Sequence, residues 1–258
     1  MSVLAMALGC AGISAALAGP VVETFPGGRI DWTQQRLVVE ASSEKGAGAM
    51  SDLKAVEQAA RGTLAPRLEA AARQVRIDGE ADVASLMDGG GTMAEMLGEN
   101  LLSWRVTESR YYTSGRVELT AELRLQPWLS PAVIGVAAGS EDATLDAQQT
   151  GVVIDARGTG LKPSFAPRVL APSGEPVYSA SALSREAASR VAPAVWVTDP
   201  ADAEAVARAG GAPLFIRASE VRQSCDVVLD PRDAALLRVL ADETDLLARG
   251  LVVVIVDP

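Results

Sequence analysis

Residues 116–125 alternate strictly between polar and apolar side chains, and this pattern constrains the fold more than any other in the chain. Successive side chains of a β-strand point to opposite faces, so the pattern predicts a strand with one buried face and one wet face. The cluster Thr113-Ser114-Gly115 predicts a turn back to a strand over residues 104–112. A sheet with one solvated face is typically antiparallel. We therefore expect an antiparallel sheet in the first half of the chain, with these inward side chains: Val117, Leu119, Ala121, Leu123 and Leu125.

A second hairpin is predicted over residues 27–43. Ile30 and Trp32 alternate with polar neighbours, and Gln34-Gln35 is suited to the turn. The inward face of its second strand would carry Leu37, Val39 and Ala41.

Helices are expected between the two hairpins. Apolar residues recur every three or four positions over residues 51–75, which predicts an amphipathic helix. Gly62 and Pro66 lie inside it and should bend or interrupt it. A second helical segment is predicted over residues 82–102, with a break at the glycine triplet 89–91. Residues 19–125 therefore form a domain of order ββααββ, an antiparallel sheet with helices on one face.

Residues 126–149 are interpreted as a linker, because they contain Pro127, Pro131 and the polar run 139–142. The second domain is predicted to span residues 150–258. It opens with a β-branched strand at 152–154. A strand pair then follows across the turn Pro172-Ser173-Gly174, with flanks at residues 169–170 and 177–178.

The end of the second domain shows a weak internal duplication. Apolar strands at residues 195–197 and 227–229 each lead into an Asp-Pro pair, at Asp199 and Asp230. In each copy a helix, a glycine and another strand follow, and the aspartate is suited to cap the helix. These strand-helix-strand units predict a mixed α/β domain. The fold class is therefore α+β, with two small domains.

Composition excludes several classes of function. The chain has no histidine, which removes the commonest general base and metal ligand and every Ser-His or Cys-His arrangement. Its net charge of −10 argues against a nucleic-acid or anionic-membrane surface and favours basic partners. Cys10 and Cys225 are too few for a disulfide framework or a zinc site.

The N-terminus predicts export. Residues 3–18 are almost entirely apolar or small, and Ala16-Leu17-Ala18 before Gly19 matches a secretory cleavage site, so residues 1–18 are interpreted as a signal peptide. The alternative is a lipobox ending at Cys10, and membrane contact is expected only if that cysteine is lipidated. Both interpretations predict a periplasmic protein, with outer-membrane association in the second.

Motifs with catalytic spacing are weak. Ser-x-x-Lys occurs at residues 42–45 and 51–54, but the partner motifs of penicillin-recognising enzymes are missing and Ser51 is explained as a helix cap. The glycine-rich runs 88–92 and 157–160 match no phosphate-binding pattern and are interpreted as turns. No catalytic, cofactor-binding or metal residue is predicted, no cofactor is expected, and the chain is predicted not to be an enzyme. A hydrolase using two distant carboxylates stays open as a further hypothesis.

One turn is a candidate for interaction. Asp155 follows the strand at 152–154, and Arg157 and Lys162 flank a glycine-punctuated segment behind it. These three residues could hold an acidic group or make an assembly contact.

The same region carries a family resemblance. The matching segments are residues 150–158 (TGVVIDARG), 160–163 (GLKP), 166–170 (APRVL) and 174–178 (GEPVY), supported by 30–33 (IDWT) and an Ala-rich helix with Ala59, Ala60 and Arg61. They resemble exported bacterial envelope proteins of the LPP-type lipoprotein group, which includes the flagellar basal-disk protein FlgP and relatives of the flagellar assembly protein FlgT.

The resemblance implies an export signal, a small self-associating α+β domain and a structural role at the outer envelope or around the flagellar motor. We therefore expect a non-enzymatic scaffold that forms homo-oligomers, with envelope or flagellar motor proteins as further partners. The alternative is a periplasmic module that binds a small ligand or glycan through the turn at Arg157 and Lys162.

Overall fold

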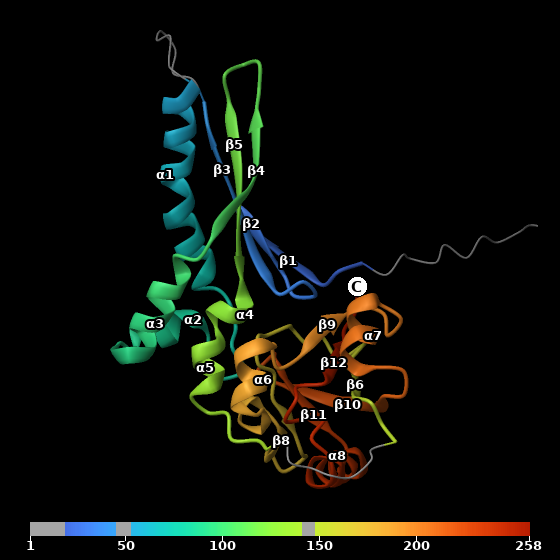
Figure 1. Cartoon of the computed structure of the whole chain (residues 1–258). Helices are drawn as coiled ribbons and strands as arrows, with labels where there is room; N and C mark the ends of the chain where they lie inside the picture. The colour runs from blue at the N-terminus through green and yellow to red at the C-terminus, as the bar shows by residue number, and fades with distance from the viewer. Residues whose placement is uncertain (1–18, 45–52, 141–147) are drawn as a thin grey trace, which may run out of the picture.

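The computed structural model describes residues 19–44, 53–140 and 148–258 (Figure 1). The predicted signal peptide, Cys10 and Ser51 lie outside these residues, and each Ser-x-x-Lys segment is only partly inside them. The chain forms two units, one around a five-stranded antiparallel sheet and one around a seven-stranded mixed sheet with helices. The predicted α+β class is confirmed. Within the described ranges, no helix combines the length and apolarity needed to cross a membrane.

The N-terminal sheet has the order β1-β2-β3-β5-β4. Its strands are β1 (Val22–Phe25), β2 (Gly28–Asp31), β3 (Arg36–Ser43), β4 (Arg105–Tyr111) and β5 (Val117–Arg124). Both predicted hairpins are present, and Leu37 lies opposite Leu123 across β3 and β5. The predicted inward side chains are buried on both strands. Strand β1 was not predicted, because its four residues are half-buried or exposed and carry little hydrophobic pattern.

Helix α1 (Leu53–Ala72) packs on β3 and β5 and is continuous. The prediction that Gly62 and Pro66 interrupt it is wrong. Both residues lie on the exposed face, away from the buried stripe of Val56, Ala60, Leu64 and Leu68. Pro66 cannot donate to the carbonyl of Gly62, but that carbonyl is on the side where water replaces the bond. The space around the Gly62 Cα is open, so nothing there opposes the helix.

Two shorter helices follow, α2 (Val83–Asp88) and α3 (Gly91–Leu101), separated at the predicted glycine break. Asp82 caps α2 by accepting from the backbone N–H of Ser85, and the Ser85 hydroxyl accepts from the Asp82 N–H in return. This reciprocal pair satisfies two N–H groups that the helix itself leaves unbonded.

Part of the predicted linker is instead helical and buried. It contains α4 (Leu125–Trp128) and α5 (Ser130–Ile134), while residues 141–147 lie outside the described structure. Pro131 sits in the first turn of α5, where its missing N–H costs no helix bond. Trp128 is buried and its indole N–H donates to the carbonyl of Leu97 at 3.0 Å. Pro127 and Pro131 therefore lie within the short helices α4 and α5, whereas the sequence predicted a linker.

The C-terminal sheet has the order β8-β7-β11-β10-β6-β12-β9. Its strands are β6 (Val152–Asp155), β7 (Val169–Leu170), β8 (Pro176–Tyr178), β9 (Val195–Val197), β10 (Leu214–Arg222), β11 (Asp226–Leu229) and β12 (Val252–Ile255). The four strands β10, β6, β12 and β9 are parallel, and the predicted β7–β8 pair is antiparallel.

The helices of this unit are η1 (Ala180–Ala182), α6 (Arg185–Arg190), α7 (Ala203–Ala209) and α8 (Pro231–Glu243). The second copy of the duplication is as predicted, since the Asp230 carboxylate accepts from two N–H groups of the first turn of α8. The first copy differs. Helix α7 is capped by Asp202, and Asp199 only closes a turn onto the N–H of Ala201. Asp202 competes successfully because it is itself an aspartate directly before a helix-forming run.

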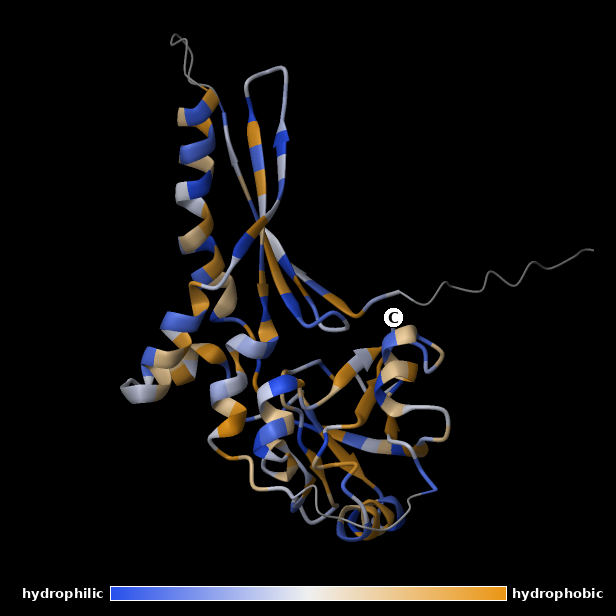
Figure 2. Ribbon diagram, viewed as in Figure 1, coloured by the Kyte–Doolittle hydropathy of each residue, from blue (hydrophilic) through white to orange (hydrophobic). Residues whose placement is uncertain are grey.

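The larger of two hydrophobic clusters runs through both units, and the smaller lies within the C-terminal unit. Trp32 and Trp128 of the first unit and Trp196 of the second are almost completely buried in the same cluster. In Figure 2, hydrophobic and hydrophilic residues alternate along β5, whereas hydrophobic residues dominate the strands of the C-terminal sheet. The difference is the one expected between an antiparallel strand with a wet face and parallel strands covered on both faces.

Candidate functional site

The predicted interaction turn is occupied by its own charges. The Arg157 side chain donates to the Asp155 carboxylate through Nε at 2.8 Å and Nη2 at 2.6 Å. The hydrogen bonds and charge of Arg157 lower the pKa of Asp155. The next backbone N–H, of Gly158, donates to Asp257 at 2.9 Å. The turn therefore neutralises its arginine internally and offers no strong anion site.

Lys162 lies in different surroundings from Arg157. It is exposed and lines a pocket of about 340 Å³ together with Arg76 and Cys225. Arg76 in that pocket is committed to Glu23 and to the carbonyl of Pro163. The structure thus brings Asp155 and Arg157 together but places Lys162 elsewhere.

The acidic residues around the Lys162 pocket are also committed. Asp78 accepts from the backbone N–H groups of Glu80 and Ala81, and Glu80 pairs with Arg168 at 2.6 Å. Asp82 is the cap of α2. Cys225 is buried, and burial raises the pKa of its thiol. Among the described residues, no group of three or more acids and cysteines is arranged to hold a metal ion.

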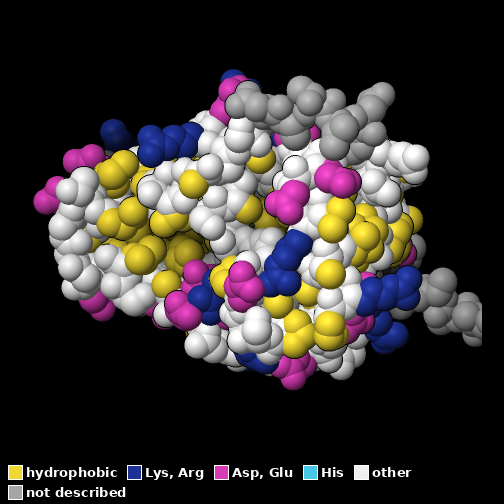
Figure 3. All heavy atoms as spheres, turned by 90° about the horizontal axis from the view of Figure 1, so that it is seen from below, with side chains coloured by type: hydrophobic (Ala, Val, Ile, Leu, Met, Phe, Trp, Pro, Cys, Tyr) yellow, Lys and Arg dark blue, Asp and Glu magenta, His cyan; other side chains and the backbone are white. Residues whose placement is uncertain are grey.

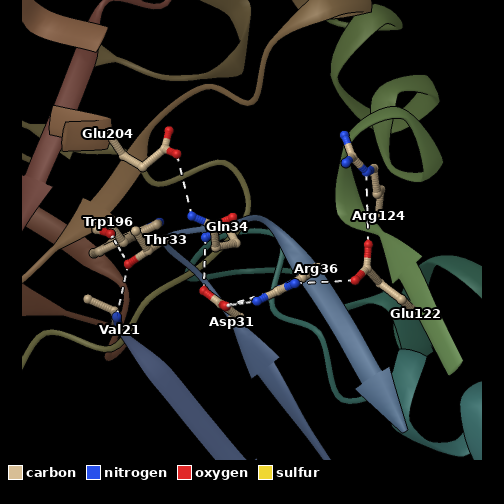
Figure 4. A network of polar contacts seen from close by, with 9 residues as sticks. All are labelled: Val21, Asp31, Thr33, Gln34, Arg36, Glu122, Arg124, Trp196 and Glu204. Atoms are coloured by element: carbon tan, nitrogen blue, oxygen red, sulfur yellow. Dashed lines mark hydrogen bonds and ion pairs between the residues drawn. The ribbon is translucent and has the colours of Figure 1, made fainter. Parts of the chain in front are cut away.

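A polar network joins the two units at the turn between β2 and β3 (Figure 4). The Thr33 hydroxyl donates to the Trp196 carbonyl at 2.6 Å and accepts from the Val21 N–H at 2.9 Å. Asp31 is buried and accepts from the Gln34 N–H and from Arg36, which also reaches Glu122. The Thr33 side chain therefore links the turn to the backbone of β9, which carries Trp196, and to the backbone of Val21 before β1.

A cleft of about 310 Å³ opens beside this network and is lined by both units. Three arginines line it, Arg124 from the N-terminal unit and Arg190 and Arg208 from the C-terminal unit. Gln34, Gln35, Gln126 and Glu204 line it as well. The Gln34 amide donates to Glu204 across the junction at 3.4 Å, and Gln126 donates to the Ala188 carbonyl at 3.1 Å. This surface, which we call the junction cleft, concentrates cations in an acidic protein.

Arg208 is the most unusual of the three arginines. It is partly buried, and burial lowers its pKa. Its Nη1 donates to the carbonyls of Ala192 at 3.0 Å and Gly250 at 2.8 Å. Within the described part of the chain, no carboxylate lies at ion-pair distance from it. A partly buried cation held only by carbonyl dipoles is incompletely compensated.

Gln35 adds a second unusual feature. Its φ is +53°, in the left-handed region that costs a residue with a side chain about 1–2 kcal/mol. The amide Nε2 donates to the Trp32 carbonyl at 2.7 Å, which fixes the orientation of the side chain. The Oε1 atom is then buried and has no hydrogen-bond donor in the described structure. Backbone strain combined with an unsatisfied acceptor is characteristic of functional positions.

Residues 151–258 match the family model for the second domain of Treponema pallidum Tp0624. The match begins at the start of the C-terminal sheet and includes Arg190, Glu204 and Arg208. A comparison with curated proteins found no match. The junction cleft therefore combines a Tp0624-like unit with Gln35, Arg124 and Gln126 from the unmatched part of the chain.

Sequence reasoning missed the junction cleft. Its arginines come from the end of β5, the end of α6 and the end of α7, and nothing in their spacing relates them. Among the residues that line it, the sequence analysis named Gln34 and Gln35 only as a turn, Thr33 only in a family resemblance and Val195 only in a strand.

Proposed function

We propose that the chain is a non-enzymatic, exported envelope scaffold that self-associates, with a flagellum-associated ring or disk as one setting. The observation that carries this proposal is the close packing of the two units against each other. The two units share the larger hydrophobic cluster and are fastened by buried hydrogen bonds such as Thr33 to Trp196. From this body an arm of α1, β3 and the β4–β5 hairpin extends away from the C-terminal unit (Figure 1).

Two separate apolar surfaces support self-association. Seen from below, hydrophobic side chains gather in a hollow on the side of the molecule that carries α2, α3 and α5 (Figure 3). Met96 on α3, Leu102 directly after α3 and Val136 shortly after α5 are exposed, with Leu102 at 75%, and we call these three residues the first patch. The second patch is the outer side of α8, where Leu236 and Val239 are exposed. Exposed apolar clusters on a soluble surface commonly mark interfaces.

The use of two different patches fits a ring. If the first patch of one copy contacts the second patch of the next, the contact is heterologous, and repeating it closes a ring or builds a filament. Residues 83–103 contain three acids, Asp88, Glu95 and Glu99, and neither Lys nor Arg. Repulsion between these acids disfavours contact of the first patch with itself, which supports the head-to-tail arrangement.

Light scattering of the chain from Gly19 onward, over a concentration series, tests the proposal. We expect assemblies whose mass grows with concentration. Leu102→Glu and Leu236→Glu should each reduce the chain to monomers, while an equimolar mixture of the two variants should form dimers and stop there. Val206→Glu changes an exposed apolar residue on α7, outside both patches, and should assemble normally. A strictly monomeric parent protein would contradict the scaffold function.

The second candidate function is a periplasmic module that binds a small ligand or glycan. The observation that favours it is the junction cleft, with its three arginines and the unsatisfied Oε1 of Gln35. The proposed binding site is therefore the junction of the two units and not the turn at Arg157, because the Arg157 guanidinium is held by Asp155. Ligand-induced stabilisation in a thermal-shift assay tests this function.

A further inference from the structure

We infer that the junction cleft binds the carboxylate of a small organic acid that also carries O–H or N–H donors, such as an acidic sugar or a short peptide. The site goes beyond the scaffold function and rests on the second candidate function, for which it names the class of ligand.

Charge is the first argument. The chain carries a net charge of −10, yet the wall of this cleft has three arginines and one glutamate, Glu204. Arg124 is exposed, and its nearest carboxylate, of Glu122, is 3.9 Å away. Arg190 is paired with Glu186 at 2.7 Å, but both side chains are largely exposed. Exposed ion pairs are worth at most about 1 kcal/mol, so an incoming carboxylate competes with them readily.

Arg208 supplies the fixed part of the site. A guanidinium has donors on Nε, Nη1 and Nη2, and here Nη1 is used by the two carbonyls. In the described residues, no acceptor meets its Nε or Nη2. The two carbonyl bonds hold the side chain in place, so little rotamer entropy is lost when a carboxylate arrives. A bound carboxylate would also compensate the positive charge of Arg208, which burial removes from water.

The hydrogen-bond acceptors of the cleft indicate what accompanies the ligand's carboxylate. Among the described residues, the exposed Glu204 carboxylate accepts only the long bond from Gln34, and the buried Oε1 of Gln35 accepts none. The Glu204 carboxylate is an acceptor that a ligand can reach, so it favours a ligand with hydroxyl or amide donors next to its negative group. A bare inorganic anion offers fewer such donors. The ligand is therefore expected to be polar around the carboxylate.

Location adds a consequence for binding. Gln35 and Arg124 belong to one unit and Arg190 and Arg208 to the other, so a ligand in the cleft contacts both. A ligand that binds only the assembled junction stabilises the folded protein in proportion to the logarithm of its concentration. Thermal unfolding is therefore a direct readout that needs no known activity.

The experiment measures unfolding temperature and calorimetric affinity with glucuronate, glucose, N-acetyl-alanyl-alanine and sodium sulfate, each at matched ionic strength. Glucuronate or the dipeptide should raise the unfolding temperature, and the tighter of the two identifies a sugar or a peptide source. Glucose, which lacks the carboxylate, should leave it unchanged. Arg124→Gln, at the exposed edge of the cleft, should weaken binding about tenfold, and Arg208→Gln should weaken it more.

The matched control is Arg157→Ala, which removes an arginine outside the cleft and should leave affinity unchanged. Loss of binding in that variant would move the site to the turn and overturn the inference. Equal stabilisation by sulfate and by both organic acids, insensitive to Arg124→Gln, would also overturn it, as would no stabilisation by any carboxylate. Arg124→Gln keeps the test valid if Arg208→Gln fails to fold. The mass measured by light scattering is a separate readout, so failure here is distinguishable from failure of the scaffold function.

Discussion

Arg168 and Asp226 form an ion pair in which the carboxylate is completely buried. The Asp226 carboxylate also accepts the backbone N–H of Gly79 at 3.1 Å, and Arg168 reaches on to Glu80. Asp226 and Arg168 belong to the C-terminal unit, whereas Gly79 and Glu80 lie on a loop of the N-terminal unit. The Asp226 carboxylate therefore joins the two units at a second contact, separate from the one at the Thr33 turn.

Asp226→Ala should destabilise the protein by about 3–5 kcal/mol, because it leaves a partly buried guanidinium and the Gly79 N–H without their acceptor. The pair raises the pKa of Arg168, so the guanidinium stays charged over the accessible pH range. Urea unfolding gives the free energy of unfolding. Glu186→Ala breaks the exposed i,i+4 pair with Arg190 and should cost less than about 0.5 kcal/mol. Equal effects from the two variants would contradict this account of the junction.

Gly79→Ala should cost about 1–3 kcal/mol, because an added Cβ would lie 2.3 Å from a carboxylate oxygen of Asp226. We expect the variant to have a lower urea midpoint, and the contact between the two units should be lost at a lower urea concentration than in the parent protein. Gly62→Ala is the control. Its Cβ would meet open space on an exposed helix face, so the substitution should stabilise the protein by about 0.5–1 kcal/mol.

Thr33→Val keeps the shape of a buried side chain but removes the hydroxyl that bonds Trp196 and Val21. The buried Trp196 carbonyl and the partly buried Val21 N–H lose their partner, and we expect a loss of about 1–3 kcal/mol in the free energy of unfolding. Thr33→Ser retains the hydroxyl and should recover most of that loss. If the serine and valine variants are equally unstable, the methyl group and not the hydrogen bonds holds the turn.

Stability should fall at alkaline pH. Burial raises the pKa of Tyr178 far above its ordinary value, and its hydroxyl donates to the Pro193 carbonyl at 2.6 Å. Burial also raises the pKa of Cys225. Because the folded pKa values exceed the unfolded ones, the stabilisation is fully present below about pH 8.5 to 10 and is lost as pH rises further.

The slope should reach about 1.4 kcal/mol per pH unit from Tyr178, and Cys225 contributes in the same direction. Denaturant unfolding between pH 7 and 11 measures it. Tyr178→Phe should flatten the alkaline limb while lowering stability at neutral pH by about 1 kcal/mol, the worth of its hydrogen bond. An alkaline limb that is unchanged in this variant would assign the effect to another group.

The sequence predicted local structure wherever one pattern was strong. The alternation over residues 116–125 specifies β5 and its buried face, and Asp230-Pro231 specifies the start of α8. Pro66 shows the limit of local rules, because only the packing of α1 reveals that the proline faces water. The sequence did not predict α4 and α5 either, because only their packing in the folded protein reveals these short helices.

The junction lay beyond sequence reasoning for a different reason. Arg124 and Arg208 are brought together by the docking of two sheets, and neither residue carries a local signal of the other. The turn at Asp155 and Arg157 showed the reverse case. Its pattern suggested a free cation, but a contact two residues away in the chain neutralises it.

The position of β12 has a consequence for folding during translation. Val252–Ile255 is synthesised after β6 and β9, yet it lies between them in the sheet, bonded to β6 on one side and β9 on the other. Until it emerges, β9 has no sheet to join and the Thr33 turn has no settled surface to dock on. Both units therefore stay incomplete during translation until β12 has been made. A nascent chain that stops before β12 would lose this strand and the attachment of its first unit, and would be exposed to chaperones and proteases.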